Sequence, residues 1–350
     1  MSKIITNLID KLNEEKKLTL DEYKTILTGY DKEDFDYTKN LAVKARKKIY
    51  GNKVYIRGLI EISNYCKNGC YYCGINRSNK NCTRYRLSKN EILGCCEYGY
   101  GLGFRTFVLQ GGEDNHFTDE LVCDIVHDIK KMYPDCAVTL SLGEKSYDSY
   151  KALYDAGADR YLLRHETADS ELYSRLHPDD LTLENRMECL YNLKKIGFQT
   201  GCGIMVGSPY QKNEHIAKDL KFIEEFSPEM CGIGPFLPHR DTVFGTFEKG
   251  SLELTLFLLS IIRIMNPNIL LPSTTALGTI KEDGREMGLL HGANVIMPNL
   301  SPEFAKDKYM LYDNKLRTGL ESATELDELK KKISSIGYEI VTDKGDHIKV

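Results

Sequence analysis

A regular alternation of two segment types runs from residue 54 to residue 297. Short runs rich in β-branched and aromatic residues are separated by helix-length amphipathic segments, and glycines close several of these helices. Eight strand-like runs stand out, at Val54–Ser63, Thr106–Gln110, Val138–Leu142, Arg160–His165, Gln199–Val206, Met230–Phe236, Ile269–Thr275 and Ala293–Met297. The helical segments include Lys89–Gly101, Asp119–Met132, Tyr147–Ala156, Leu183–Ile196, Asn213–Phe226 and Leu252–Met265. Eight alternations predict an α/β fold, a full (βα)8 TIM-type barrel, with a doubly wound open sheet as the alternative.

The segments that flank this alternation have a different character. Residues 1–50 carry apolar residues at spacings of three and four, which predicts an N-terminal helical extension. Residues 51–312 form the predicted barrel, and residues 313–350 form a short C-terminal extension that we expect to pack on it. In that extension the pattern predicts a helix over Thr324–Ser335 and a strand over Tyr338–Thr342. No linker rich in proline, glycine or serine divides the chain.

Composition excludes several classes of function. The net charge of −4, from 47 basic and 51 acidic residues, provides no basic surface for nucleic acid. The N-terminus is charged and lacks the apolar core of a secretory signal, and no apolar run approaches the length of a membrane span. We therefore expect a cytoplasmic protein. Eleven cysteines, an odd number, in such a chain argue against a disulfide framework.

Three of these cysteines, Cys66, Cys70 and Cys73, follow the first predicted strand at CxxxCxxC spacing. Three thiolates can hold three corners of a 4Fe–4S cluster and leave one iron open for another ligand. A partial zinc site or a group of packing thiols is the alternative, but structural zinc requires four ligands and no second pair follows. The other cysteines are expected to be reduced packing residues, at Cys82, Cys95, Cys96, Cys123, Cys136, Cys189, Cys202 and Cys231.

Polar and glycine-containing motifs follow several of the predicted strands. In a barrel of this type the active site lies at the carboxyl ends of the strands, so these motifs should meet at one rim. They include Gly111-Gly112-Glu113 after the second strand, Arg164-His165-Glu166 at the fourth, Gly203 to Gly207 at the fifth and Thr274-Thr275 at the seventh. Lone histidines such as His165, His239 and His291 have no second ligand at metal spacing and are left without a role.

The cysteine motif with Tyr72, placed after the first strand of a barrel, resembles that of radical S-adenosylmethionine enzymes. This resemblance implies one 4Fe–4S cluster, with S-adenosylmethionine on its open iron, and reductive cleavage to a 5′-deoxyadenosyl radical. It also implies cofactor contacts. Tyr72 would face the adenine, and the Gly203–Gly207 backbone that contains Met205 would pair with it. The methionine amino group would be bound by Gly111, Gly112 and Glu113. Glu166 would bind the ribose, and Arg186 would bind the carboxylate.

Longer strings resemble a subgroup that contains biotin synthase, methylornithine synthase and the HydE family of FeFe-hydrogenase maturases. Those similar to the HydE family include Val108–Asp114, Thr139–Glu144, Asp159–Ala168, Gly232–Phe236, Thr274–Ala276 and Ala293–Asn299. The resemblance covers residues 54–312. It implies assembly of the hydrogenase di-iron subcluster from a small organometallic substrate, an iron that carries CO, cyanide and cysteine. It also implies other hydrogenase maturation proteins as partners, and an electron donor such as ferredoxin or flavodoxin.

Three alternatives remain. A methylornithine-synthase-like enzyme would act on an amino acid, and a non-catalytic iron–sulfur carrier would not cleave the cofactor. A biotin-synthase-like enzyme would need cysteines at inner strand positions that Gln110, Ser141 and Gly201 occupy. Because no cysteine follows Cys231, a second iron–sulfur cluster is not expected.

The predicted substrate site lies inside the barrel. Arg160 and Arg164 alternate on the fourth strand, so both are expected to face one side and to bind an anion together with the hydroxyls of Thr274 and Thr275. The alternative is a structural network of these arginines with Glu144 and Glu166. Further cavity-lining positions are predicted at Met297, Tyr309 and Tyr312.

Overall fold

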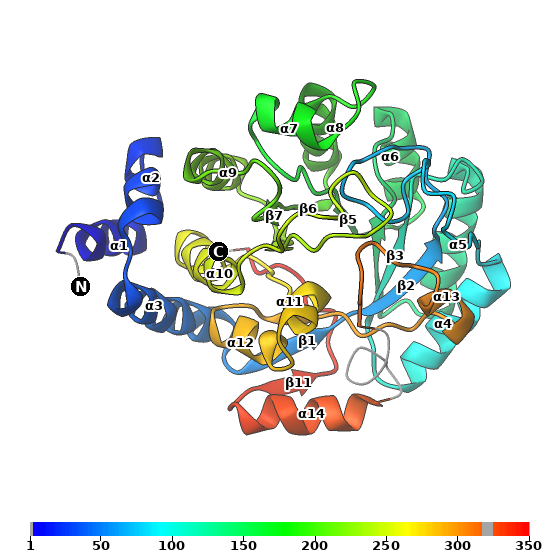
Figure 1. The fold of residues 1–350 in the computed structure, drawn as a ribbon. Coiled ribbons are helices and arrows are strands. Elements are labelled where there is room, and N and C mark those ends of the chain that lie inside the picture. Colours follow the sequence, from blue (N-terminus) through cyan, green and yellow to red (C-terminus); the bar gives the residue numbers. More distant parts are fainter. Residues whose placement is uncertain (1–2, 317–324, 350) are drawn as a thin grey trace.

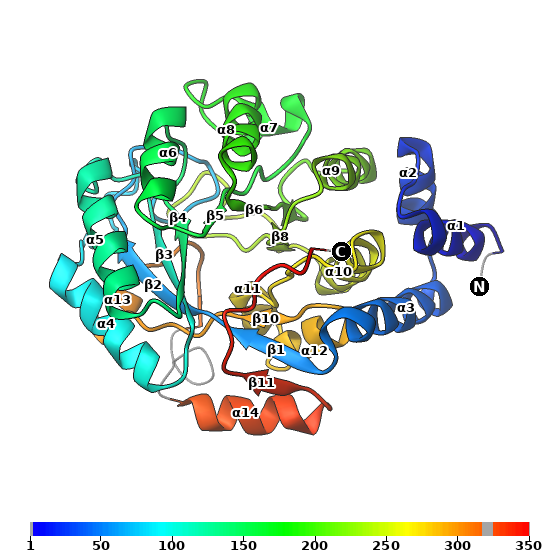
Figure 2. The ribbon, with the colours of Figure 1, turned by 180° about the vertical axis from the view of Figure 1, so that it is seen from behind.

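A computed structural model describes residues 3–316 and 325–349 and contains one closed parallel barrel (Figures 1 and 2). Its strands are β1 (Lys53–Ile56), β2 (Gly58–Ser63), β3 (Thr106–Gly111), β4 (Ala137–Ser141), β5 (Arg160–Leu162), β6 (Gln199–Cys202), β7 (Met205–Val206), β8 (Met230–Cys231), β9 (Gly234–Pro235), β10 (Val295–Ile296) and β11 (Glu339–Val341). Six of them pair in parallel in the order β2-β3-β4-β5-β6-β8. The predicted α/β class is confirmed.

Closure of the barrel depends on short pairings beyond β8. Met230 of β8 pairs with Leu270, and Pro272 pairs with Val295 of β10. β10 pairs in parallel with β1, and Leu59 of β2 pairs with Asn299. With β1 and β2 as one stave interrupted at Arg57, the ring returns to its start after eight staves, as a TIM-type barrel requires.

Helices surround this ring on its outer face (Figure 1). They are α1 (Lys3–Glu15), α2 (Leu20–Gly29), α3 (Lys32–Tyr50), α4 (Lys89–Gly101), α5 (Asp119–Met132), α6 (Tyr147–Asp155), α7 (Ser170–Leu176), α8 (Leu183–Ile196), α9 (Asn213–Phe226), α10 (Leu252–Met265), α11 (Thr275–Ile280), α12 (Gly284–Leu290), α13 (Glu303–Lys306) and α14 (Leu326–Ser335). Alternate strand residues such as Phe107 and Leu109 are fully buried in the main core between strands and helices.

The later predicted strands are shorter or more broken than the sequence indicated. The run Gln199–Val206 divides into β6 and β7, and Met230–Phe236 divides into β8 and β9. Glycines at the interior positions of these runs allow close approach; a Cβ on Gly203 would collide with the Gly232 carbonyl oxygen. The predicted strand Ile269–Thr275 pairs only at single positions, and Thr275 begins helix α11 instead.

The N-terminal helices form a separate layer against one side of the barrel. In Figures 1 and 2 they lie beside α9 and α10, and contacts join α3 to α10 and α2 to α9. Tyr30 stacks on Phe257 of α10 with ring centroids 4.0 Å apart. None of the helices in the described residues is both long and apolar enough to cross a membrane.

The C-terminal segment covers the end of the barrel where the strands begin. β11 pairs in parallel with β1, and the tail then crosses beneath the ring (Figure 2). The Lys344 carbonyl accepts hydrogen bonds from Thr106 and Arg160, while the Asp346 carboxylate accepts bonds from Arg160 and Gln199. These contacts leave the carboxyl ends of the strands as the place for a site.

Candidate active site at the carboxyl ends of the strands

The three motif cysteines lie half-buried in the loop that follows β2. Burial raises the pKa of the Cys66 thiol, and burial together with the neighbouring Cys66 raises the pKa of Cys70 to about 12. The thiols are thus close enough to influence one another. No group of three possible ligands among residues 3–316 and 325–349 converges on a single metal ion. A cluster needs no such convergence, since each thiolate binds a different iron.

Arg84 braces this loop from within. Its guanidinium donates to the carbonyl oxygens of Ile75 at 2.7 Å, Asn76 at 2.6 Å and Asn79 at 3.2 Å, and also to that of Asn64. Buried loop carbonyls need such partners, and an arginine fork can serve several at once. Sequence reasoning missed this residue, because only the folded loop brings the four carbonyls together.

The glycines after β3 allow the cysteine loop to pass over them. Gly111 pairs with Ser63 of β2. A Cβ on Gly112 would lie 2.7 Å from the Cβ of Cys66 and would also collide with the Tyr65 carbonyl oxygen. The motif therefore requires glycine at this position for close approach to the cysteine loop.

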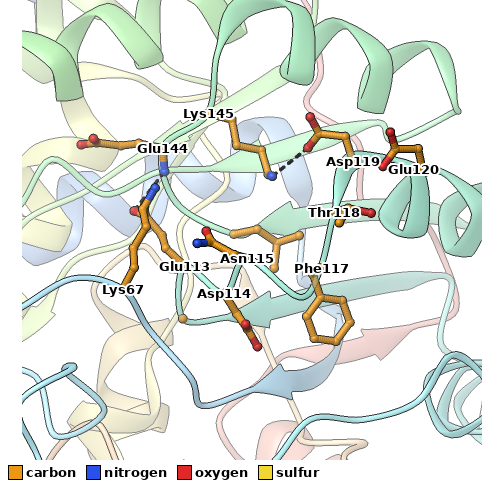
Figure 3. A pocket seen from close by; sticks show the side chains of 12 residues that line it. Lys67, Glu113, Asp114, Asn115, Phe117, Thr118, Asp119, Glu120, Glu144 and Lys145 are labelled. Atoms are coloured by element: carbon orange, nitrogen blue, oxygen red, sulfur yellow. Dashed lines mark hydrogen bonds and ion pairs between the residues drawn. The ribbon is translucent and has the colours of Figure 1, made fainter.

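Glu113 follows directly and lies at the edge of a cavity of about 320 Å³ (Figure 3). Its Oε1 accepts a hydrogen bond from the Glu144 backbone N–H at 3.0 Å, and its Oε2 lies 3.3 Å from the Lys67 ammonium. Gly143 has a φ of +78°, and a Cβ there would collide with the Glu113 side chain. The loop after β4 is thus shaped around this carboxylate.

Glu166 and Arg164 meet just beyond β5. The Arg164 Nη2 donates to Glu166 Oε2 at 2.8 Å and to the Ile204 carbonyl at 2.7 Å. Glu166 has a φ of +64°, which is rare outside glycine and often marks functional sites. The buried Nε of Arg164 makes no hydrogen bond to the described residues.

Arg186 extends from α8 to the same rim. Its Nε donates to Glu144 Oε1 at 2.6 Å, and its Nη1 donates to the Arg164 carbonyl at 3.1 Å. These contacts tie the loops after β4 and β5 to one guanidinium. Of the alternative network of Arg160 and Arg164 with Glu144 and Glu166, only the Arg164–Glu166 pair is present, because Glu144 pairs with Arg186 and Arg160 contacts neither carboxylate.

Tyr72, between two of the cysteines, contacts a histidine that the sequence analysis did not single out. The Tyr72 hydroxyl lies 3.1 Å from Nε2 of His177, whose Nδ1 lies 3.0 Å from the Tyr173 carbonyl oxygen. Burial lowers the pKa of His177 to about 4, so the ring is neutral at pH 7. A neutral ring that donates from Nδ1 accepts a hydrogen bond from the Tyr72 hydroxyl at Nε2. Met205 packs in an apolar cluster with Tyr72.

The other predicted substrate residues stand in different settings. Thr274 precedes helix α11 and its buried Oγ1 has no partner among the described residues, whereas Thr275 is the first residue of that helix. Met297 follows β10 and is partly buried. Tyr309 is buried, with its hydroxyl 3.5 Å from Gln110 Nε2. Tyr312 follows in the same segment.

A buried ion pair that was not predicted lies beside Tyr309. Glu61 on β2 is fully buried, and its carboxylate accepts bonds from the Lys315 ammonium and from Asn299 at 2.9 Å. Lys315 also donates to the Tyr309 carbonyl at 3.0 Å. The pair fixes the segment after β10 to the first stave of the barrel.

Arg160 lies apart from this group, which corrects its predicted place beside the substrate. It is the first residue of β5 and is fully buried at the opposite end of the barrel. Its guanidinium binds Thr106, Gln199, the Lys344 carbonyl and Asp346 at 2.5 Å. Arg164 lies four residues further along the chain, beyond the end of β5, and an extended backbone of that length spans roughly 13 Å. Alternation predicts which face a residue occupies, but not its depth in the barrel.

Comparison with known proteins places this geometry in a family. The family model described as the Radical SAM superfamily matches residues 60–223. The FeFe hydrogenase maturase subunit HydE of Thermotoga maritima is 41% identical over 343 residues, which cover 98% of this chain and 97% of that protein. The 3-methylornithine synthase of Methanosarcina acetivorans is 27% identical over 332 residues, or 94% of this chain and 92% of that protein.

Solved structures agree with these sequence relatives. A crystal structure of methylornithine synthase (PylB) superposes with a TM-score of 0.81 at 25% identity, and covers 95% of this chain and 97% of its own. A structure of HydG, a maturase of the FeFe-hydrogenase, has the same fold with a TM-score of 0.81 at 20% identity, over 98% of this chain and 77% of its own. The chain is a radical SAM enzyme and belongs to the HydE family of FeFe hydrogenase maturases.

Proposed function

We propose that this protein cleaves S-adenosylmethionine reductively and directs the radical onto a small iron unit that carries CO, cyanide and cysteine, during assembly of the FeFe-hydrogenase di-iron subcluster. The observation that carries this proposal is the near full-length similarity to a HydE protein at 41% identity. The folded site supports it, because the cysteine loop, Glu113, Glu166 and Arg186 lie at one rim of the barrel.

The donor set fits the implied cofactors. Cys66, Cys70 and Cys73 would hold one 4Fe–4S cluster, in a loop already braced by Arg84. S-adenosylmethionine bound there supplies a 5′-deoxyadenosyl radical when the cluster is reduced. We assign its amino group to the Gly111–Glu113 segment and its carboxylate to Arg186, whose fork suits a carboxylate.

The nucleoside part would lie toward β6 and β7. Glu166 would accept from the ribose hydroxyls, and Tyr72 and Met205 would flank the adenine within their shared apolar cluster. The neutral His177 would orient the Tyr72 ring by accepting a hydrogen bond from its hydroxyl. The apolar side chains of this cluster would limit the access of water to a reactive carbon radical.

The substrate would lie deeper in the barrel. Two buried polar atoms have no partner among the described residues there, Arg164 Nε and Thr274 Oγ1. A buried donor without a partner costs about 1–3 kcal/mol, so these atoms favour an anionic ligand such as a carboxylate or cyanide. Thr275, Met297, Tyr309 and Tyr312 would line the same space. Arg160 is left out of this site because its donors are occupied by the C-terminal tail.

The remaining parts of the proposal concern partners. An external one-electron donor such as ferredoxin or flavodoxin would reduce the cluster, and other hydrogenase maturation proteins would receive the product. We propose that Cys66, Cys70 and Cys73 hold the only cluster of the chain. A cytoplasmic location stays a prediction from the sequence.

Cofactor cleavage tests the proposal. Reconstituted protein given dithionite and S-adenosylmethionine should form 5′-deoxyadenosine, the Cys70→Ala variant should not, and a Cys82→Ala control should. Absence of cleavage by the wild-type protein would support a non-catalytic carrier instead. Cofactor-dependent consumption of lysine would favour the methylornithine-synthase reaction, which the 27% identity to that enzyme makes the second candidate.

A further inference from the structure

Asp219 is a fully buried carboxyl group on α9 that the proposed mechanism does not use. Its Oδ1 accepts a hydrogen bond from the Ala168 backbone N–H at 2.5 Å. Its Oδ2 makes no hydrogen bond to the described residues. Burial of a carboxyl group is costly, so a residue of this kind needs a structural or functional reason.

The segment that Asp219 contacts is the one that carries Glu166. The N–H groups of His165 and Glu166 both donate to the Gly203 carbonyl, and the Thr167 N–H donates to the His165 carbonyl at 2.8 Å. This tight turn accompanies the φ of +64° at Glu166. A left-handed conformation outside glycine costs about 1–3 kcal/mol and persists only where surrounding contacts fix it.

We propose that Asp219 is a positioning residue for the cofactor site, because it holds the segment 165–169 from behind and so keeps Glu166 in the left-handed conformation that directs its carboxylate to Arg164. This inference rests on the proposed function, in which Glu166 binds the ribose. On the outer side, Asp169 caps α7 through the Leu172 N–H. The carboxyl end of the segment is therefore held by two helices, α9 through Ala168 and α7 through Asp169, while the Gly203 carbonyl holds its amino end.

The electrostatic surroundings indicate that Asp219 acts in its neutral form. Burial raises its pKa to about 8, the Ala168 N–H and the Thr167 hydroxyl oppose this effect, and the charges of Asp169 and Glu166 add to it. A protonated carboxyl and a carboxamide have nearly the same shape, and each offers one oxygen acceptor to Ala168. The Asp219→Asn variant should therefore keep the positioning role of this residue, whereas Asp219→Ala should lose it.

Two measurements on three variants test this role. Asp219→Ala should raise the dissociation constant of the reconstituted protein for S-adenosylmethionine about tenfold, since the Ala168 N–H loses its partner. Hydrogen exchange in residues 163–170 of the cluster-free protein should become faster. Asp219→Asn should stay within about twofold of the wild type in both measurements. Leu220→Val, a core change one residue along α9, is the control for general destabilisation.

Either of two results would overturn the inference. In the first, Asp219→Ala and Leu220→Val lower the Tm equally and have the same cofactor affinity and the same exchange rates. In the second, Asp219→Asn is as impaired in both measurements as Asp219→Ala. If Asp219→Ala does not fold, Asp219→Leu, which fills the space but removes the acceptor of the Ala168 N–H, should show the same change in exchange and affinity, and an unchanged Asp219→Leu would reject the role. Failure of the wild-type protein to cleave the cofactor would reject the proposed function, while the exchange comparison would still decide on Asp219.

Discussion

Arg186 on α8 and Glu144 after β4 form an ion pair at the rim of the barrel, with Nε 2.6 Å from Oε1 and both side chains 11% exposed. The same guanidinium donates to the Arg164 carbonyl. One side chain thus joins the loops of two neighbouring staves beside the cysteine loop. A guanidinium held in this way is pre-oriented for a carboxylate ligand.

Replacement of Arg186 by glutamine should weaken cofactor binding. The change removes the fork and leaves the Glu144 carboxylate partly buried without its partner, so the dissociation constant for S-adenosylmethionine should rise about 30-fold, equivalent to about 2 kcal/mol. Equilibrium titration of the reconstituted protein measures this. Arg175→Gln, which removes a cation over the Tyr210 ring outside the site, is the matched control. Equal affinities of the two variants would contradict the assigned role.

Gly112→Ala should strongly reduce cluster binding without unfolding the protein. The added Cβ would lie 2.7 Å from the Cβ of Cys66, so the cysteine loop has to move. Iron and sulfide content after reconstitution should fall at least several-fold. Gly94→Ala on α4 is the control, because a Cβ there meets no atom within 4 Å and alanine favours a helix by about 0.5–1 kcal/mol. A fully loaded Gly112→Ala protein would show that close approach is not required.

The Arg160–Asp346 pair should stabilise the fold rather than bind substrate. Asp346→Ala leaves a fully buried guanidinium with fewer partners, and because Asp346 itself is half-exposed we expect a loss of about 1–2 kcal/mol. Thermal unfolding should show a lower Tm with cofactor affinity unchanged. The exposed pair Lys151–Asp155 provides the control, and Asp155→Ala should cost less than about 0.5 kcal/mol. A change in cofactor or substrate affinity without a lower Tm would instead show that Arg160 contributes to the site.

His291 should make stability fall in mild acid. Burial lowers its pKa to about 4, below the unfolded value of 6.5, so the unfolded chain binds the proton more readily between these values. The contribution of His291 to stability is therefore full above pH 6.5 and decreases as the pH falls, by about 1.4 kcal/mol between pH 7.5 and 5.5. Unfolding of the cluster-free protein at the two values measures the loss, and His291→Gln should reduce it. An unchanged pH dependence in that variant would reject the assignment.

Local sequence chemistry predicted the helices well. The predicted bounds of α4, α5, α8, α9 and α10 are confirmed, and side-chain caps at Ser88, Thr118, Thr182 and Ser251 mark four of their beginnings. Short elements such as α7 and α11 were missed, because a helix of six or seven residues gives little periodic signal. β5 and the strands after it were predicted too long, since their pairing depends on neighbours rather than on their own residues.

For the site, too, local motifs could be predicted from the sequence, whereas contacts between distant residues could not. The rim motifs with Glu113 and Glu166 were predicted from their place after strands and from family resemblance, and the fold brings them to one rim. Arg84, His177 and Asp219 escaped prediction because their partners are backbone groups or rings distant in sequence. No local pattern marks such residues, so only the folded chain identifies them.

Activation of a FeFe hydrogenase in a defined mixture of the maturation proteins that lacks its own HydE tests the proposed role in hydrogenase maturation. Addition of this protein with S-adenosylmethionine, a reductant and the iron–CO–cyanide–cysteine unit should restore hydrogen production, and the Cys70→Ala variant should leave it at the level of the mixture without HydE. Equal hydrogenase activity with and without the wild-type protein, under conditions where it cleaves S-adenosylmethionine, would contradict the account.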